Sequence, residues 1–418
     1  MEQETQLATK LWNKNFIMLV IGQIVSLFGN AILRFALPLY ILLEYGSPEL
    51  MGRVLALSVI PMILISPLGG VLADRVNKKR LIVFLDFFTA GGSFLYLWAF
   101  GLLSIVPITI VMLMLLITIN SMMAAATDSS YPLIVPEKEL VRANSVGMTI
   151  NTLAMMLGPM LGGILLVRFG LTALLFVGSI CFALAAVMEL FIRIPKVKQE
   201  SSGSLLNVVA GDLRDGLHFA IKTQPLIGKI LLVIIIFGLI VASFGHIGIP
   251  VLITQSLGLD ADLVGVSAGI MGAGGIVGGV LSGILGSRVR VQKGHWLLCA
   301  IGACFIPIGL VFLFPLPTAA GFIIITAMMF LAMGISTIFT VQIITFVQQA
   351  SPPELLGKMV ALIMSATVLS QPLGQWLYGF LFERFGETPW VIILPTAFLA
   401  ILLFPLWSGR YFKSIAEK

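Results

Sequence analysis

Long apolar runs follow one another through almost the whole chain, and only short polar breaks separate them. Most runs reach the ~20 residues that a helix needs to cross the hydrocarbon core of a membrane. They lack the alternation of apolar and polar residues that marks barrel strands. The pattern therefore predicts an all-α polytopic membrane protein. We expect twelve membrane-spanning helices, at residues 16–43, 50–73, 81–103, 106–129, 143–168, 171–193, 226–253, 262–286, 295–314, 318–346, 359–383 and 389–409.

The second half of the chain repeats the first at an offset of 216 residues. The repeated positions include Gly22, Phe28, Gly29, Gly158 and Arg168, which return as Gly238, Phe244, Gly245, Gly374 and Arg384. An internal repeat in a hydrophobic chain is typical of transporters whose halves face each other across a central site. We therefore expect two six-helix bundles related by pseudo-two-fold symmetry, an N-terminal one at 1–193 and a C-terminal one at 226–418.

The only long break, at 194–225, separates the two predicted bundles. It begins with polar residues of linker composition and then becomes amphipathic, with apolar residues every four positions from Leu205 to Ile221. This periodicity predicts a helix that lies on the cytoplasmic membrane surface and tethers the halves. A regulatory docking role is the alternative.

Composition and charge agree with the membrane assignment. Hydrophobic residues make up 59% of the chain, charged residues 11%, and the mean hydropathy is +1.08. If the N-terminus is cytoplasmic, the inside segments hold 21 Lys and Arg residues and the outside loops three. The positive-inside rule then places both termini in the cytoplasm. The net charge of +6 reflects this topology and does not indicate a nucleic-acid partner. All three cysteines fall within predicted spans, so we expect packing residues and no disulfide framework.

The loop after the second predicted span carries a distinctive cluster. Its residues are Gly70, Asp74, Arg75, Lys78 and Lys79. This spacing resembles a motif of the major facilitator superfamily, although Asn77 stands where that family usually has glycine. A carboxylate at a cytoplasmic helix end can pair with a cation or with a neighbouring helix N-terminus, and such contacts can break and re-form. The resemblance implies a gate latch; the alternative is an ordinary basic cytoplasmic loop.

The fifth predicted span contains Gly158, Pro159, Gly162 and Gly163. This stretch resembles the end of a motif that, in the same superfamily, is typical of exporters running as antiporters. Ser145 and Ala154 stand where upstream glycines are expected. Gly and Pro also allow bending and close helix contact, whatever the direction of transport. Gly275, Gly279 and Gly283 predict a second packing face, in the eighth span.

Two further stretches, 132–145 and 212–217, resemble the drug-efflux branch that includes macrolide exporters. Members of that branch and its relatives export drugs, siderophores or lysolipids. The resemblance implies a twelve-helix fold that works by alternating access in the cell membrane. It further implies a monomer that contacts lipid, an amphiphilic small-molecule substrate, no cofactor, and a proton gradient as the energy source.

Polar residues inside spans are costly and are therefore functional candidates. By resemblance, spans 1, 4, 7 and 10 line a central cavity. The candidates there are Asn30, Arg34, Asn120, His246, Thr337, Thr340 and Gln342. Arg34 can instead extend its side chain to the outer interface. If it faces the cavity, anionic or zwitterionic substrates are favoured over lipophilic cations.

Three residues are candidates for proton coupling. His246 can titrate near neutral pH, and a carboxyl in an apolar setting, Asp86 or Asp128, can hold a proton. Packing hydrogen bonds or cytoplasmic ion pairs are the alternatives. Glu189 is expected at the membrane interface. The acidic residue that the resemblance leads one to expect deep in span 1 is absent, which leaves the coupling ion open.

The prediction is therefore proton-coupled export of an amphiphilic or drug-like molecule. The alternative is export or flipping of a native metabolite, such as a siderophore or a lysophospholipid. The chain has no Gly-x-x-x-x-Gly-Lys-Ser/Thr loop for ATP. An enzyme is disfavoured, because the three histidines, at 218, 246 and 295, fall in separate segments and predict no metal site. A channel would not need the latch loop.

Overall fold

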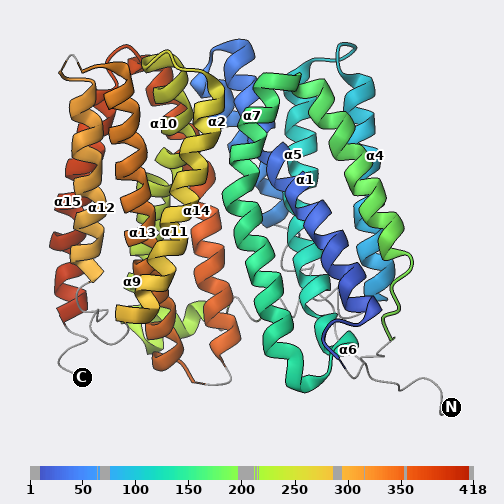
Figure 1. Cartoon of the computed structure of the whole chain (residues 1–418). Helices are drawn as coiled ribbons and strands as arrows, with labels where there is room; N and C mark the ends of the chain where they lie inside the picture. Colours follow the sequence, from blue (N-terminus) through green and yellow to red (C-terminus); the bar gives the residue numbers. More distant parts are fainter. Residues whose placement is uncertain are drawn as a thin grey trace. The chain divides into compact units, whose positions relative to one another are not determined.

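The computed structural model describes residues 10–63, 65, 76–195, 211, 214, 216–285, 294–314, 316–352 and 355–413. The regular elements in these ranges are helices (Figure 1). In the first half they are α1 (Lys14–Tyr45), α2 (Pro48–Ser58), α4 (Lys78–Ala99), α5 (Ile105–Asp128), α6 (Tyr131–Ile134), η1 (Glu137–Glu139) and α7 (Leu140–Glu189). In the second half they are η2 (Phe219–Thr223), α9 (Pro225–Phe237), η3 (Gly238–Ala242), α10 (Ser243–Val251), η4 (Leu252–Ser256), α11 (Ala261–Leu285), α12 (Gly294–Val311), α13 (Thr318–Ala350), α14 (Leu356–Phe385) and α15 (Trp390–Lys413).

The described part of the chain contains nine helices long and apolar enough to cross a membrane, so the chain is a multi-pass membrane protein. One of them, α7, covers two of the predicted spans. Its two parts meet at Gly170, whose φ of 73° belongs to the left-handed region that glycine adopts without strain. The count of twelve helices and the pseudo-symmetry of the bundles stay predictions.

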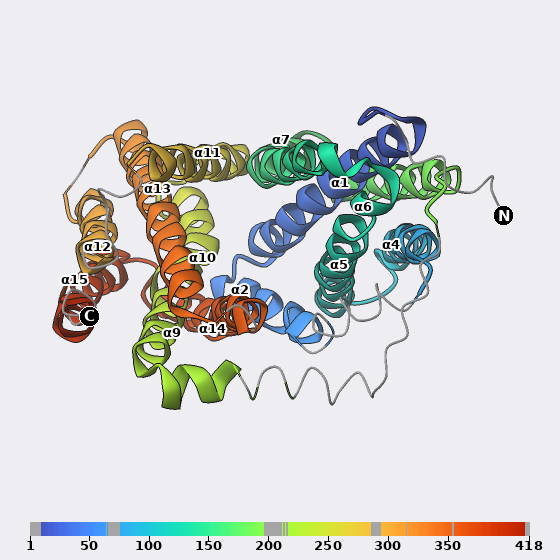
Figure 2. The ribbon, with the colours of Figure 1, turned by 90° about the horizontal axis from the view of Figure 1, so that it is seen from below.

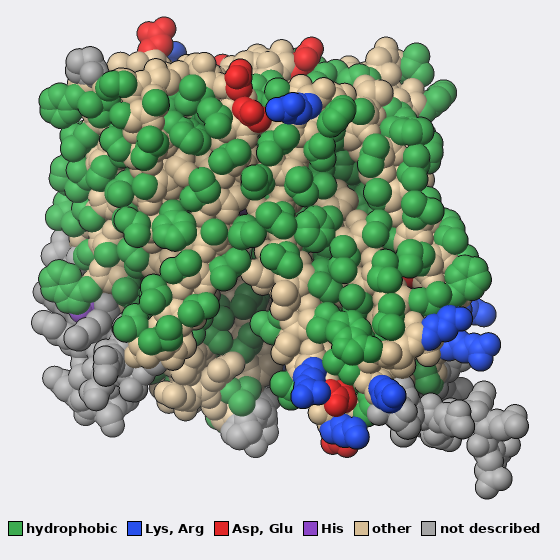
Figure 3. Space-filling model, viewed as in Figure 1, with side chains coloured by type: hydrophobic (Ala, Val, Ile, Leu, Met, Phe, Trp, Pro, Cys, Tyr) green, Lys and Arg blue, Asp and Glu red, His purple; other side chains and the backbone are tan. Residues whose placement is uncertain are grey.

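Apolar side chains cover the flanks of the helices. Phe84, Leu95 and Trp98 of α4 are more than half exposed, as lipid-facing residues are in a protein without its membrane. On the face drawn in Figure 3, charged side chains gather at the two ends of the helices and the band between is hydrophobic. An exposed apolar band of this kind fits contact with lipid better than contact with water.

Contacts divide the chain into two units, one made of 1–40 and 57–207, the other of 41–56 and 208–418. Residues 41–56 therefore join the second unit, although they precede the predicted boundary at 193. In the first unit α4 packs along α5 and α7. The side chain of Asn77 caps α4 by accepting a hydrogen bond from the backbone N–H of Arg80 at 3.2 Å.

Glycines bring α7 against α1 within the first unit. A Cβ added at Gly162 would lie 2.9 Å from the carbonyl oxygen of Ile32, and one at Gly158 would overlap the Cβ of Ala31. Only hydrogen fits at these positions, so the helix backbones approach as closely as small residues allow. The predicted packing role of this glycine motif is confirmed.

In the second unit α13 packs along α11 and α12, and α12 along α15 (Figure 2). The tight contact of α11 is made by Gly274 and Gly278, against the backbone of Phe330 and Gly334. Of the predicted packing face, Gly275 and Gly279 also lie against α13, where an added Cβ would be 3.5 and 3.9 Å from the Thr337 side chain, whereas a Cβ at Gly283 would meet nothing within 4 Å. The backbones decide which row of a glycine-rich helix faces its neighbour.

The second unit also holds α2 against α14. The Glu383 carboxylate accepts hydrogen bonds from the Ser47 hydroxyl at 2.7 Å and from the Glu49 backbone N–H at 3.2 Å. A carboxylate at a helix N-terminus satisfies free N–H groups and complements the helix dipole. One turn on, a Cβ at Gly52 would lie 2.6 Å from the Gln375 carbonyl oxygen, so the two backbones touch.

Candidate functional site

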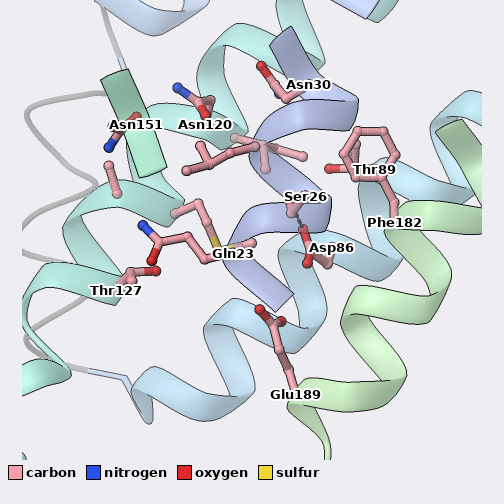
Figure 4. A pocket seen from close by; sticks show the side chains of 14 residues that line it. Gln23, Ser26, Asn30, Asp86, Thr89, Asn120, Thr127, Asn151, Phe182 and Glu189 are labelled. Atoms are coloured by element: carbon pink, nitrogen blue, oxygen red, sulfur yellow. Dashed lines mark hydrogen bonds between the residues drawn. The ribbon is translucent and has the colours of Figure 1, made fainter. Parts of the chain in front are cut away.

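A polar pocket lies within the first unit, among α1, α4, α5 and α7 (Figure 4). The cavity volume that the centre of a water molecule can reach is about 30 Å³. This volume is enough for about two waters. Fourteen residues line it: Gln23, Ser26, Leu27, Asn30, Asp86, Thr89, Ile119, Asn120, Met123, Ala124, Thr127, Asn151, Phe182 and Glu189.

Helical spacing explains how these residues share one cavity. Gln23, Ser26 and Asn30 follow one another at three and four positions along α1, which places them on one face. On α5 the lining residues Asn120, Ala124 and Thr127 have the same spacing. Each helix therefore turns several polar side chains toward the same cavity.

Two carboxyl groups are the chemical centre of the pocket. Asp86 of α4 is 1% exposed and Glu189 of α7 is 2% exposed. Their side chains interact directly and point toward each other in Figure 4. The Ser26 hydroxyl donates a hydrogen bond to Oδ1 of Asp86 at 2.8 Å. Oδ2 of Asp86 and Oε2 of Glu189 have no hydrogen-bond donor among the described residues.

Glycines on α1 make room for this arrangement. A Cβ at Gly22 would lie 3.0 Å from Oε1 of Glu189, and one at Gly29 would lie 3.2 Å from the ring of Phe182. Both are among the positions that recur at the 216-residue offset. In the first unit they let the far end of α7 bring Glu189 up to Asp86.

The amides of the pocket are partly fixed by neighbours. The Tyr131 hydroxyl donates to Oε1 of Gln23 at 3.1 Å, and Nδ2 of Asn30 donates to the carbonyl of Leu116 at 3.0 Å. Burial, followed by the negative charge of Asp128, raises the pKa of the Tyr131 phenol to about 12. The phenol therefore stays a donor at neutral pH, and it holds the Gln23 oxygen away from other donors.

Several residues predicted from the sequence meet in this pocket. Asn30, Asn120 and Asp86 line it together. Arg34 lies one turn beyond Asn30 with an exposed side chain and is not among the lining residues. Asp128 is exposed at the end of α5, next to the lining residue Thr127.

The remaining predicted cavity residues belong to the second unit and line no part of this pocket. His246 lies on α10 with an exposed side chain. Thr337 and Thr340 lie on α13 and donate to carbonyls of their own helix, at 3.0 and 2.9 Å. Gln342 is partly buried on the same helix. Their proposed contact with substrate stays a prediction.

The structure describes only some of the predicted gate residues. Lys78 and Lys79 form the first turn of α4. Gly70, Asp74 and Arg75 lie outside the described residues, as does most of the 194–225 linker. Pro159 and Gly163 lie on α7 between and beside the glycines that contact α1.

The sequence reasoning missed half of the carboxyl pair. Glu189 was expected at the interface because Arg193 follows one turn later, but the structure buries it. It also missed Gln23, Ser26, Thr89 and Asn151. The three- and four-residue spacing of Gln23, Ser26 and Asn30 was the signal that could have revealed a polar stripe on span 1. No cluster of three potential metal ligands occurs in the described ranges.

Known proteins resemble this chain over most of its length. A family model described as Major Facilitator Superfamily matches residues 19–375. Macrolide efflux protein A of Streptococcus pyogenes is 24% identical over 400 residues, covering 94% of this chain and 95% of that protein. Enterobactin exporter EntS of Salmonella choleraesuis (strain SC-B67) is 27% identical over 370 residues, covering 87% of this chain and 84% of that protein.

A solved structure shares the fold. A bacterial homologue of the iron transporter ferroportin, in its inward-facing state, matches with a TM-score of 0.69 and 20% identity, covering 94% of this chain and 98% of that chain. The nucleoside transporter NupG matches with a TM-score of 0.72 and 14% identity, covering 96% and 99%. At these identities the likeness concerns the fold alone.

Proposed function

The chain belongs to the Major Facilitator Superfamily, and we propose that it exports an amphiphilic small molecule from the cytoplasm by alternating access, driven by proton antiport. It is a transporter and not an enzyme. Relatives named for efflux of a macrolide and of enterobactin support the outward direction. The excess of Lys and Arg in the predicted inside segments supports cytoplasmic termini.

The observation that carries the proposal is the pocket with Asp86 and Glu189. Two buried carboxyl groups in an apolar helix bundle are expensive unless they hold a proton or a cation. A group that must be neutralised in the closed site, and that can ionise when water enters, is what a proton-coupled carrier needs. Proton uptake and release at this pair supplies the proposed coupling.

The other predicted residues keep their proposed roles in this scheme. Arg34, His246, Thr337, Thr340 and Gln342 are proposed to line the path of the substrate. Asp74 and the basic residues after it are proposed to form the cytoplasmic latch. The contact of Gly158 and Gly162 with α1 would couple movement of α7 to the helix that carries Asn30.

The second candidate function is export or flipping of a native metabolite. The likeness to an enterobactin exporter favours a siderophore in particular, and lysophospholipids fit the same amphiphilic description. This candidate differs from the first in substrate and not in mechanism.

The test begins with thermal-shift screening of the purified full-length protein against macrolides, siderophores and lysophospholipids, since a ligand of the folded state raises its melting temperature. The stabilising compound is then followed in proteoliposomes under an imposed pH gradient. We expect the gradient alone to drive transport, and Asp86→Asn to abolish that dependence. Glu137→Gln, which removes an exposed carboxyl outside the pocket, is the matched control. Transport indifferent to the gradient would refute proton coupling.

A further inference from the structure

Three helix ends of the first unit meet at one apolar cluster. Phe16 near the start of α1, Leu81 near the start of α4 and Ile192 just after the end of α7 belong to the same group of packed side chains. Asn15 also ties two of these ends together, because its Oδ1 accepts a hydrogen bond from the backbone N–H of Arg193 at 3.0 Å. Residues that border the cluster along the chain therefore lie at the same end of the helices.

The residues that border this cluster are basic. They are Lys14, Arg80 and Arg193, and all three are exposed. None of the three forms an ion pair with another described residue. Lys10 and Lys79 add two positive charges close by along the chain. In Figure 3, Lys and Arg side chains stand together at the edge of the hydrophobic band, on the side where α1 begins in Figure 1.

A second basic group, at the junction of η1 and α7, differs because acidic residues balance it. Lys138 lies between two glutamates, and Arg142 pairs with Glu139 at 3.1 Å. The first group has no such balance. Both carboxyl groups on α4 and α7 are buried in the pocket, and Asp128, exposed at the adjoining end of α5, supplies a single negative charge. Positive charge is therefore in excess on the surface around Lys14.

An apolar face of α4 continues from the basic group along the helix. Phe84, Phe87, Gly91 and Phe94 follow Arg80 at three- and four-residue spacing, which places all five on one face, and all are exposed. A Cβ at Gly91 would meet nothing within 4 Å, so open space lies over the middle of this face. Gly91 is about 16 Å along the helix from Arg80. That length is close to one leaflet of the hydrocarbon core, about 15 Å.

We propose that Lys14, Arg80 and Arg193 bind the phosphate headgroup of an anionic phospholipid, whose acyl chains lie along the exposed face of α4. Basic residues at the end of a membrane helix attract anionic lipid, and a guanidinium matches two phosphate oxygens at once. Trp12 packs on Phe16 and is 57% exposed, as suits an aromatic ring at headgroup level. This site is separate from the pocket and goes beyond the proposed export.

Native mass spectrometry of the delipidated full-length protein in a neutral detergent tests the inference, because it counts bound lipids and gives their dissociation constants. The probes are phosphatidylglycerol and phosphatidylcholine with identical acyl chains, and glycerophosphoglycerol, which is the first headgroup without chains. Each basic residue near a membrane surface strengthens binding of anionic lipid about fivefold. We therefore expect phosphatidylglycerol to bind at least about tenfold more tightly than phosphatidylcholine. This preference should shrink as the salt concentration rises.

Variants locate the lipid. Lys14→Gln, Arg80→Gln and Arg193→Gln should each weaken phosphatidylglycerol about fivefold and leave phosphatidylcholine unchanged. The triple variant should bring the two lipids to within about threefold of each other. Lys138→Gln, which removes one positive charge from the balanced group, is the matched control and should keep the wild-type preference. Because all four side chains are exposed, we expect each variant to fold, and thermal unfolding without lipid checks this.

Three results would overturn the lipid site. The first is equal binding of the two lipids, or a preference that survives in the triple variant. The second is binding of glycerophosphoglycerol as tight as that of the intact lipid, which would show a site for a soluble phosphate that does not use the apolar face. The third is phosphatidylglycerol found only on a dimer, which would mean that a second copy covers this face. Since the readout is lipid binding, none of these results bears on the proposed export.

Discussion

Replacing Gly162 by alanine should destabilise the protein through a single methyl group. The new Cβ would lie 2.9 Å from the carbonyl oxygen of Ile32 and 3.2 Å from the ring of Phe35, whereas ordinary contacts begin at 3.4 Å. The nearer obstacle is the backbone carbonyl of Ile32, which no rotamer change can move. To bring the new Cβ to an ordinary contact distance, α1 and α7 must therefore separate by roughly 0.5–1 Å. Overpacking of this kind costs about 1–3 kcal/mol in the free energy of unfolding.

The matched control is Gly91→Ala. Gly91 lies inside α4, and a Cβ there meets nothing within 4 Å. Both substitutions gain the same helix propensity, about 0.5–1 kcal/mol, so their difference isolates the steric term. At roughly 2–4 °C per kcal/mol for a unit of this size, Gly162→Ala should melt about 2–12 °C below Gly91→Ala in detergent. Equal melting temperatures would show that α1 and α7 are not in backbone contact at this point.

Three further predictions follow from the first unit. Gly158→Ala should also lower the melting temperature, and adding Ala31→Gly should restore part of the loss, because the two Cβ atoms overlap; additive effects would contradict the contact. Tyr131→Phe should lower the free energy of unfolding by about 1–3 kcal/mol, since it leaves the buried Oε1 of Gln23 without its donor. Tyr45→Phe, at an exposed tyrosine, is the control in thermal unfolding. An equally small shift of the melting temperature in both variants would argue against the hydrogen bond. Arg34→Ala should slow export of the compound found by thermal-shift screening, because the exposed Arg34 is proposed to line the path of the substrate. Unchanged transport in proteoliposomes would contradict that role.

The sequence pattern identified residues that the structure buries in the pocket or at a helix contact where local pattern and chemistry coincide. Asp86 and Asn30 stand out because a polar side chain inside an apolar run has few harmless places to go. The glycines at 158 and 162 stand out because small residues at four-residue spacing make a contact face. The prediction that Glu189 lies at the membrane interface was wrong, because a carboxyl near the end of an apolar run can lie in the interface or turn inward. That choice depends on whether α1 leaves space, which Gly22 provides.

The sequence by itself determined that the helices are surrounded by lipid, roughly where the helices lie, and which superfamily the chain resembles. Hydrocarbon imposes apolar runs of membrane length, and backbone groups in lipid must bond within the helix, so these features are written in the order of residues. Tertiary structure alone decided that Glu189 meets Asp86, that Gly274 and not Gly275 of α11 makes the close backbone contact with α13, and that residues 41–56 pack with the second unit. These outcomes depend on rotations of a few tens of degrees about helix axes and on close backbone approach. No single segment fixes such quantities, because they result from how all the helices fill space together.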